Sequence, residues 1–256
     1  MIEYLNSLPE DTEEIDVSGK GIRHMPDLTR FKNLKILHCK NNQLTTLPDL
    51  NKKLEKLFCS NNQLTTLPAL NENLQELYCS NNRLTCFPSL NAKLEILHCQ
   101  YNQLTSLPKF NEKLQKVSCF NNRLTSLPKF NEKLETISCD NNKLTTLHLN
   151  EQLEELYCSH NRLTSLPYLN ENLEVFFYID NPLCEIISGD KSVINQKLKV
   201  LNNFRYLYYS LKFKKRFRDL LWIKIREPKI REKYSHDYLL ENLHEDTDLD
   251  EFLKKW

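Results

Sequence analysis

A frame of leucine, cysteine and asparagine recurs every twenty residues over more than half of this chain. The first copy, residues 34–51, reads LKILHCKNNQLTTLPDLN, and its fixed positions are LxxLxCxxNxLTxLPxLN. Seven more copies follow in phase, beginning at Leu54, Leu74, Leu94, Leu114, Leu134, Leu153 and Leu173. The step to Leu153 is one residue shorter than the others. A unit this short cannot bury its own apolar face, so the copies must stack to form a common core.

The fixed apolar positions predict which side chains enter that core. In the first copy they are Leu34, Leu37, Cys39, Leu44 and Leu47. Each copy contributes one short strand, and neighbouring parallel strands lie about 4.8 Å apart, so eight strands predict a sheet roughly 35–40 Å long. A proline in most copies prevents a continuous helix on the return side of the coil.

The LxxLxLxxNxL frame resembles the leucine-rich repeat family, and the short repeat with its Leu-Pro step resembles the bacterial-effector type. The resemblance implies a repeat solenoid, a horseshoe with a parallel β-sheet on the concave face and extended chain on the convex face. A degenerate copy with Ile15, Val17 and Ile22 precedes the eight, but Lys20 stands where asparagine is expected. We expect an N-terminal cap at residues 1–33, eight repeats at 34–187 and a helical C-terminal cap at 188–256.

Two columns of asparagine run through the copies. The first, called the asparagine ladder here, is Asn42, Asn62, Asn82, Asn102, Asn122, Asn142, Asn161 and Asn181. A buried amide at this position can satisfy backbone groups where each strand turns away. The second column is Asn51, Asn71, Asn91, Asn111, Asn131, Asn150 and Asn170, which we expect to shape the return turn.

The cysteine ladder, one thiol per copy, is Cys39, Cys59, Cys79, Cys99, Cys119, Cys139 and Cys158. A straight row of sulfurs does not converge on a tetrahedral metal. Adjacent strands are close enough for disulfides, but in-register side chains point the same way. We therefore expect small, buried, free thiols, with no metal and no cofactor. Cys86 and Cys184 lie off the ladder, and either could be an exposed thiol.

The position before each ladder cysteine should face solvent on the concave side, because strand neighbours alternate. It holds an aromatic or imidazole ring in six of eight copies, with Phe120 two residues further along its own strand. The candidate protein-binding residues are His38, Phe58, Tyr78, His98, Phe120, Tyr157 and Phe177. Exposed aromatic residues on a rigid sheet are typical of a partner site. Stacking along the sheet explains the same pattern without a partner, and both can hold.

Charged and amide residues flank this face. One edge carries Lys35, Glu55, Gln75, Glu95, Gln115, Glu135, Glu154 and Glu174, and the other carries Gln43, Gln63, Arg83, Gln103, Arg123, Lys143 and Arg162. An acidic edge opposite a basic edge could orient a partner. A solvated charged rim is the alternative.

The C-terminal segment has a different composition. Residues 197–233 hold 13 Lys or Arg against 3 acidic residues, whereas residues 237–251 hold 7 acidic residues and no Lys or Arg. The basic block predicts a helix that Pro228 ends, followed by short helices near 236–243 and 248–255.

Covering the open end of the stack is the simplest role of this C-terminal segment. Nucleic-acid binding is the alternative, with candidate residues Lys212, Lys214, Lys215, Arg216 and Arg218, and an anionic membrane surface is another. The acidic block argues against both.

The sequence of this tail resembles the tails of leucine-rich-repeat proteins of giant DNA viruses (mimivirus-like). The matching residues run from Leu211-Lys212-Phe213-Lys214 to Arg226-Glu227-Pro228. That resemblance implies a set of interaction proteins. Some bacterial effectors with this repeat type carry a C-terminal ubiquitin ligase with a Cys-x-Asp loop. Here the last cysteine, Cys184, is followed by Glu185 and Ile186, so that activity is not carried over.

Composition excludes several other classes. The chain has 256 residues, a formal charge of +1 and only 3 glycines, so a glycine-rich phosphate loop is not expected. No apolar run is long enough to span a membrane, and the N-terminus lacks the pattern of a signal peptide. We find no catalytic arrangement of residues. The sequence therefore predicts a non-enzymatic, intracellular module that binds a protein of unknown identity and is a monomer or weak homodimer.

Overall fold

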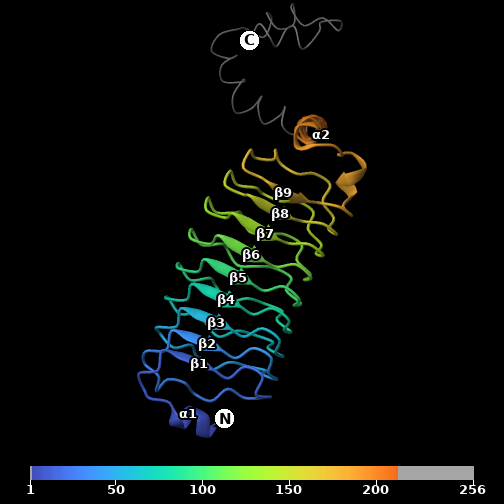
Figure 1. Ribbon diagram of the computed structural model, residues 1–256. Helices are drawn as coiled ribbons and strands as arrows, with labels where there is room; N and C mark the ends of the chain where they lie inside the picture. The colour runs from blue at the N-terminus through green and yellow to red at the C-terminus, as the bar shows by residue number, and fades with distance from the viewer. Residues whose placement is uncertain (1, 213–256) are drawn as a thin grey trace, which may run out of the picture. The chain divides into compact units, whose positions relative to one another are not determined.

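The computed structural model describes residues 2–212 and shows a stack of similar coils, one strand to each coil (Figure 1). The chain divides into two compact units, residues 1–200 and 201–256, and the coils lie in the first. The first unit begins with the short helix α1 (Ile2–Ser7). The predicted helices near 236–243 and 248–255 lie outside the described residues.

Nine strands of three residues form one parallel sheet, in which each strand pairs with the next along the chain. The strands are β1 (Glu14–Asp16), β2 (Ile36–His38), β3 (Lys56–Phe58), β4 (Glu76–Tyr78), β5 (Ile96–His98), β6 (Lys116–Ser118), β7 (Thr136–Ser138), β8 (Glu155–Tyr157) and β9 (Val175–Phe177). The register follows the repeat, so that Leu57 lies between Leu37 and Leu77. The repeat-solenoid fold and its parallel sheet are confirmed.

The core lies inside the coils. The middle residue of nearly every strand is buried, and its two neighbours are more exposed. The five inward positions predicted from the first copy, Leu34, Leu37, Cys39, Leu44 and Leu47, are all buried. Corresponding leucines and cysteines of the other coils continue the same cluster. Burial of these rows across coils supplies the apolar stabilisation that no single repeat has.

The strand count differs from the eight that the frame predicted, because the degenerate copy also forms a strand, β1. Ile15 and Val17 fill its inward positions, and both are fully buried. The absence of a ladder asparagine at position 20 does not leave the neighbouring backbone N–H groups without partners. The side-chain oxygen of Asn42 accepts hydrogen bonds from the backbone N–H groups of Lys20 and Ile22, at 3.0 Å each. A ladder asparagine thus serves the coil before its own, and the first coil has no predecessor.

The asparagine ladder joins each coil to the one before it. The Oδ1 atom of Asn102 accepts the Leu84 N–H at 2.9 Å, and its Nδ2 group donates to the carbonyls of Cys79 and Cys99 at 3.1 Å each. These contacts are buried. The amide therefore satisfies backbone groups of two coils at once, which is the structural role that the sequence predicted.

A turn in the left-handed backbone region precedes each ladder asparagine. Eight non-glycine residues there have φ between 52° and 58°, namely Asn41, Asn61, Asn81, Tyr101, Asn121, Asn141, His160 and Asp180. In the first coil Gly19 occupies this place, with φ of 66°. Asparagine tolerates this conformation better than other residues with a side chain. This tolerance explains how five of the eight coils turn without glycine, and Tyr101, His160 and Asp180 adopt the same conformation in the other three.

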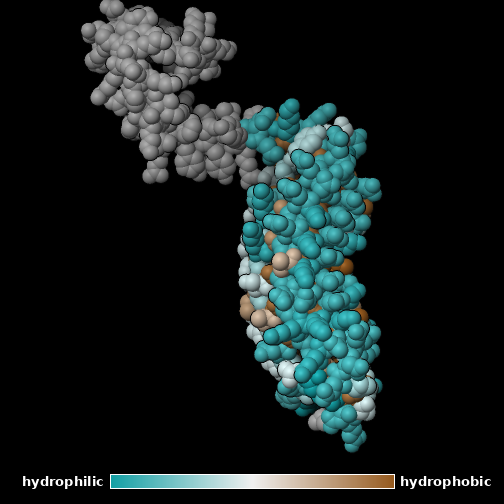
Figure 2. Space-filling view, turned by 90° about the vertical axis from the view of Figure 1, so that its left-hand side faces the viewer, coloured by the Kyte–Doolittle hydropathy of each residue, from teal (hydrophilic) through white to brown (hydrophobic). Residues whose placement is uncertain are grey.

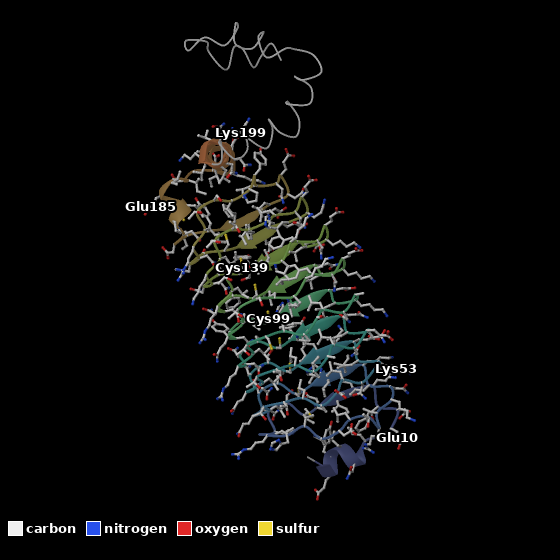
Figure 3. All side chains as sticks on the ribbon, turned by 180° about the vertical axis from the view of Figure 1, so that it is seen from behind. Glu10, Lys53, Cys99, Cys139, Glu185 and Lys199 are labelled. Carbon is white, nitrogen blue, oxygen red and sulfur yellow. The ribbon has the colours of Figure 1, made fainter. Side chains whose placement is uncertain are left out.

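The return side of the coils is extended and carries the second asparagine column. Asn71 Nδ2 donates to the Asn51 carbonyl at 3.0 Å, and Asn71 Oδ1 accepts the Asn73 N–H at 2.8 Å. Lys53, which lies on this side (Figure 3), donates through Nζ to Asn33 Oδ1 at 2.7 Å. Between residues 34 and 181 the structure has no helix, as the prolines predicted.

Both ends of the core are covered. At the N-terminal end α1 places Leu5 against the core, and Arg30 Nη2 donates to the carbonyls of Leu5 and Leu8. At the other end the 3-10 helix η1 (Pro182–Glu185) leads to α2 (Lys191–Lys212). In the first turns of α2, Ile194 and Leu198 are buried.

Helix α2 begins earlier than the basic block in which a helix was predicted. The Asp190 carboxylate accepts the Val193 N–H at 2.9 Å and so caps the start of the helix. Asn195 then accepts the Leu169 N–H and donates to the Leu169 carbonyl, at 2.9 and 3.0 Å. The helix amide thus satisfies backbone groups that another coil would otherwise satisfy. The apolar periodicity of the basic block did not reveal this start, because the helix begins with a local cap at Asp190 and with Asn195, which bonds to the last coil.

We expect Asn102→Ala to lower the free energy of unfolding by about 2–3 kcal/mol, because it leaves the buried Leu84 N–H without a partner. The carbonyls of Cys79 and Cys99 keep their bonds from Asn82 and Asn122. Urea denaturation followed by circular dichroism measures the change. The exposed control Ser106→Ala should shift stability by less than about 0.5 kcal/mol, and equal losses in the two variants would refute the bridging role.

The left-handed position gives a second expectation. Asn141 is exposed, with φ of 52°. Asn141→Val should destabilise the protein by about 1–2 kcal/mol, since a bulky β-branched side chain clashes in this conformation. Asn141→Gly should leave stability nearly unchanged, because glycine adopts positive φ freely. Melting temperatures of the three proteins test this, and a valine variant as stable as the glycine variant would contradict it.

Candidate binding surface on the sheet

The outward face of the sheet, called the sheet face here, is built by strand alternation. The buried middle residue of each strand fixes the residues before and after it on the opposite side, toward solvent. In β4 these are Glu76 and Tyr78, which flank the buried Leu77. Because the register repeats, equivalent side chains line up from strand to strand.

Four rings form a continuous stack, called the aromatic ridge here, which consists of His38, Phe58, Tyr78 and His98. Their successive centroid distances are 4.5, 4.7 and 4.8 Å. The first three rings are nearly parallel, at 8° and 10°, whereas His98 meets Tyr78 edge-on at 62°. The structure thus brings together four of the seven residues that the sequence nominated.

The remaining three do not extend the aromatic ridge. Ser118 and Ser138 interrupt the row, and beyond them Tyr157 and Phe177 form a separate stacked pair at 5.5 Å and 7°. Phe120 contacts Tyr101 edge-on, with centroids 5.1 Å apart. The rings thus fall into three groups rather than one surface.

Polar contacts hold the aromatic ridge in place. Glu76 accepts a hydrogen bond from Tyr78 Oη at 3.1 Å and pairs with Lys56 Nζ at 2.6 Å. His38 Nε2 lies 3.2 Å from the Glu14 carboxylate. The repeat frame by itself did not single out these partners. The repeat register could have found them, since Lys56 and Glu76 are 20 residues apart and therefore adjacent on the sheet.

Burial favours the uncharged forms of Tyr78 and His98 in the aromatic ridge. It raises the pKa of Tyr78 to about 12, with a further contribution from the Glu76 carboxylate. Burial lowers the pKa of His98, Lys116 lowers it further, and Glu76 opposes the shift. A neutral phenol and a neutral imidazole lose less solvation energy on contact with a partner than charged groups do.

The exposed surface offers no large apolar patch on the side of the coils in Figure 2, where hydrophilic residues predominate and apolar spots are small. On the sheet, Phe177 and Ile179 are the large apolar residues with the greatest exposure, at 52% and 58%. The sheet face thus presents individual rings beside polar groups.

The cysteines lie away from the sheet face. All seven ladder thiols are buried, and Figure 3 shows Cys99 and Cys139 within the coils. None of the nine cysteines forms a disulfide. Burial raises the pKa of Cys99 to about 12 and also raises the pKa of Cys59 and Cys79. The thiols therefore stay protonated and act as small apolar side chains.

The two cysteines off the ladder differ from each other. Cys86 is exposed, whereas Cys184 is half-buried and its Sγ lies 3.0 Å from the Tyr178 carbonyl oxygen. Within residues 2–212 no three His, Cys, Asp or Glu side chains cluster in a way that could hold a metal ion.

The basic residues nominated for nucleic acid are outside this surface. Lys212 is the last residue of α2, and Lys214, Lys215, Arg216 and Arg218 lie outside the described residues. Among the helices described, none is long and apolar enough to cross a lipid bilayer.

Family models support the repeat assignment. Residues 32–112 match a model of two tandem leucine-rich repeats in three overlapping copies, and residues 152–173 match a single leucine-rich repeat. The coils are therefore leucine-rich repeats of about 20 residues. Among curated proteins, none matches the chain.

Solved structures with the same fold include bacterial proteins. YopM from Yersinia enterocolitica is 31% identical with a TM-score of 0.64, over 67% of this chain and 38% of that one. A Shigella effector leucine-rich-repeat domain is 28% identical with a TM-score of 0.54, over 62% of this chain and 73% of that one. A leucine-rich-repeat protein of Leptospira interrogans is 25% identical with a TM-score of 0.63, over 77% and 62%. The chain thus spans about two fifths of the length of YopM.

We expect brief iodoacetamide treatment of the native protein to label Cys86 first, Cys184 slowly and the seven ladder cysteines not at all. The reason is that alkylation needs an accessible thiolate, which burial prevents. Peptide mass spectrometry after quenching identifies the labelled sites, and a sample unfolded in guanidinium is the control. Fast labelling of Cys99 in the folded protein would contradict the buried placement.

Proposed function

We propose that this chain is a non-enzymatic module that binds a protein partner through the sheet face, with the aromatic ridge as its centre. The observation that carries the proposal is the continuous stack of His38, Phe58, Tyr78 and His98 on a regular parallel sheet. Aromatic residues dominate the binding energy of protein interfaces, and rings that are already ordered lose little entropy on binding.

The surroundings of the aromatic ridge support binding as well as internal stacking. Its rings are half-buried, so each still presents area to a partner. The contact network of Lys56, Glu76 and Tyr78 fixes a polar border beside the rings. A rigid apolar centre with a polar border matches the usual anatomy of a protein interface.

Similarity to bacterial proteins favours a role at the contact between two organisms. The Shigella structure is described as an effector domain, and the YopM of Yersinia pestis is described as a leucine-rich effector protein. By analogy, we propose that this chain contacts a host protein from within a cell, as a monomer or weak homodimer. An origin in a giant DNA virus remains part of this proposal and rests on the tail resemblance.

Nucleic-acid binding through Lys212, Lys214, Lys215, Arg216 and Arg218 is the weaker candidate. It rests on the charge of residues 197–233 alone, and the acidic block that follows can neutralise that charge within the chain. The sheet face offers ordered rings and a polar border in addition to charge. We therefore favour the protein partner.

We expect replacement of Tyr78 and His98 together to reduce partner capture at least tenfold, because it removes the centre of the aromatic ridge. Two double variants remove the same two rings, one by adding charge and the other by introducing small side chains. Tyr78→Glu with His98→Glu adds charge beside Glu76, and Tyr78→Ser with His98→Ser introduces the residue that β6 and β7 already carry at this position. The measurement is affinity capture from host-cell lysate with quantitative mass spectrometry.

Tyr168→Glu is the matched control, because Tyr168 is an aromatic residue that is 63% exposed and lies on the return side, away from the sheet face. Its capture should equal that of the wild type. Circular dichroism must show that all variants fold. If the folded double variants capture the same proteins in the same amounts as the control, the aromatic ridge is not the binding centre.

A further inference from the structure

The two serines that interrupt the ring row form a gap, called the serine notch here. Ser118 and Ser138 make its floor, His98 precedes it on β5, and Tyr157 follows it on β8. Three strand spacings separate His98 from Tyr157, which is about 14 Å along the sheet. In the aromatic ridge the rings repeat every 4.5–4.8 Å. The serine notch therefore has room for two planar groups at the ring spacing of the aromatic ridge.

One wall of the serine notch is a free aromatic face. The Tyr157 ring lies parallel to Phe177 at 7°, so one of its faces is covered by that ring. Ser138 is its register neighbour on the other side, and a serine is too small to cover the second face. A planar group above Ser138 could stack there as Phe58 stacks on His38.

One end of the serine notch carries hydrogen-bond acceptors. Asp140 follows Ser138 by two residues, and its Oδ2 atom accepts the Ser138 hydroxyl at 3.1 Å. Its Oδ1 atom accepts the Ser159 N–H at 2.8 Å, so the carboxylate is held in position. Each oxygen keeps a lone pair for a further donor. Gln100, two residues beyond His98, has a buried Oε1 atom with no hydrogen-bond partner in the described part of the chain, and Phe120 lies between it and Asp140 in the register.

The strands of the serine notch carry mainly acidic groups, whereas the basic edge of the same coils carries Arg123, Lys143 and Arg162. Besides Asp140, Glu155 lies on β8 beside Tyr157, whose hydroxyl it accepts at 3.4 Å. The acidic edge adds Glu135 and Glu154 on the same two coils. Lys116 at the opposite end is the one lysine or arginine on strands β6 to β8. Burial keeps His98 neutral near pH 7, so that wall does not repel a cation.

We propose that the serine notch receives an arginine side chain of the protein partner, which stacks on Tyr157 and hydrogen-bonds to Asp140. The proposal rests on the function proposed above and names the chemistry that this part of the sheet face selects. A guanidinium is planar, positively charged and a forked donor, so it meets the aromatic face and the carboxylate together. Lysine lacks the plane for stacking, phenylalanine has no donor for Asp140, and tyrosine or tryptophan offers one donor without the positive charge.

The probe is acetyl-arginine amide, titrated into the ¹⁵N-labelled full chain and followed by amide chemical shifts. We expect saturable shifts of millimolar affinity, since one side chain offers few contacts, centred on Ser118, Ser138 and Asp140. Nα-acetyl-lysine amide, which keeps its charged ammonium group, should bind more weakly. Nα-acetyl-citrulline amide, which is planar but neutral, should bind about tenfold more weakly. Stronger binding of acetyl-tyrosine amide, or equal binding of citrulline, would overturn the choice of arginine.

Two variants locate the site. Asp140→Asn should weaken the arginine probe about tenfold, while Asp49→Asn, an exposed carboxylate on the return side, should not change it. Ser138→Tyr should abolish binding by filling the notch, and it should fold because Tyr78 and Tyr157 hold the same position in other strands. Shifts that persist in both notch variants would show that the arginine binds elsewhere and would refute the proposal.

The outcome is separable from that of the proposed function. If arginine fails to bind but the Tyr78 and His98 variants still lose their captured proteins, the sheet face binds partners without the notch. If the probe binds the notch but those variants capture normally, the aromatic ridge is not the binding centre. For a captured partner, Asp140→Asn should lower affinity and Asp49→Asn should not.

Discussion

The structure depends on the hydrogen bonds that the ladder asparagines make between neighbouring coils. Where each strand ends the backbone turns sharply inside the molecule, and its N–H and carbonyl groups cannot reach water. An amide such as that of Asn102 serves the carbonyls of two coils and one N–H group. Unsatisfied groups at this depth would cost about 1–3 kcal/mol each, repeated in every coil. Apolar burial drives stacking, but these amides fix how one coil sits on the next.

A fixed stacking geometry has a consequence on the opposite side of each strand. Since every coil is set on its neighbour by the same bonds, an outward side chain always meets the equivalent side chain of the next strand. The stack of His38, Phe58 and Tyr78 follows directly from that register. So does its interruption, because two serines in consecutive coils make a gap with defined walls. The outward positions can vary without disturbing the core, and this freedom allows such a sheet to carry a binding surface.

The sequence allowed much of this to be predicted, because the period was strict and each column had one chemical role. The inward rows, the amide function and the free thiols followed from the frame. Three points did not. The degenerate first copy forms a strand, since the register matters there more than Lys20. Helix α2 begins at Lys191, with a local cap from Asp190 and with Asn195 bonded to the last coil. Phe120 shares the sheet face but contacts Tyr101 instead of the ring row.

The sequence alone determined the repeat, the fold class and which residues face out, because a twenty-residue unit has few ways to bury its leucines. It could not decide which outward rings touch or where the face is open. Those properties depend on side-chain torsions and on neighbours 20 residues away, as in the contact of Lys56 with Glu76. Only the tertiary structure separates the aromatic ridge from the Tyr157–Phe177 pair and leaves Tyr157 with an open face beside Asp140. It does so because stacking depends on ring distance and orientation, which the pattern of residue types does not contain.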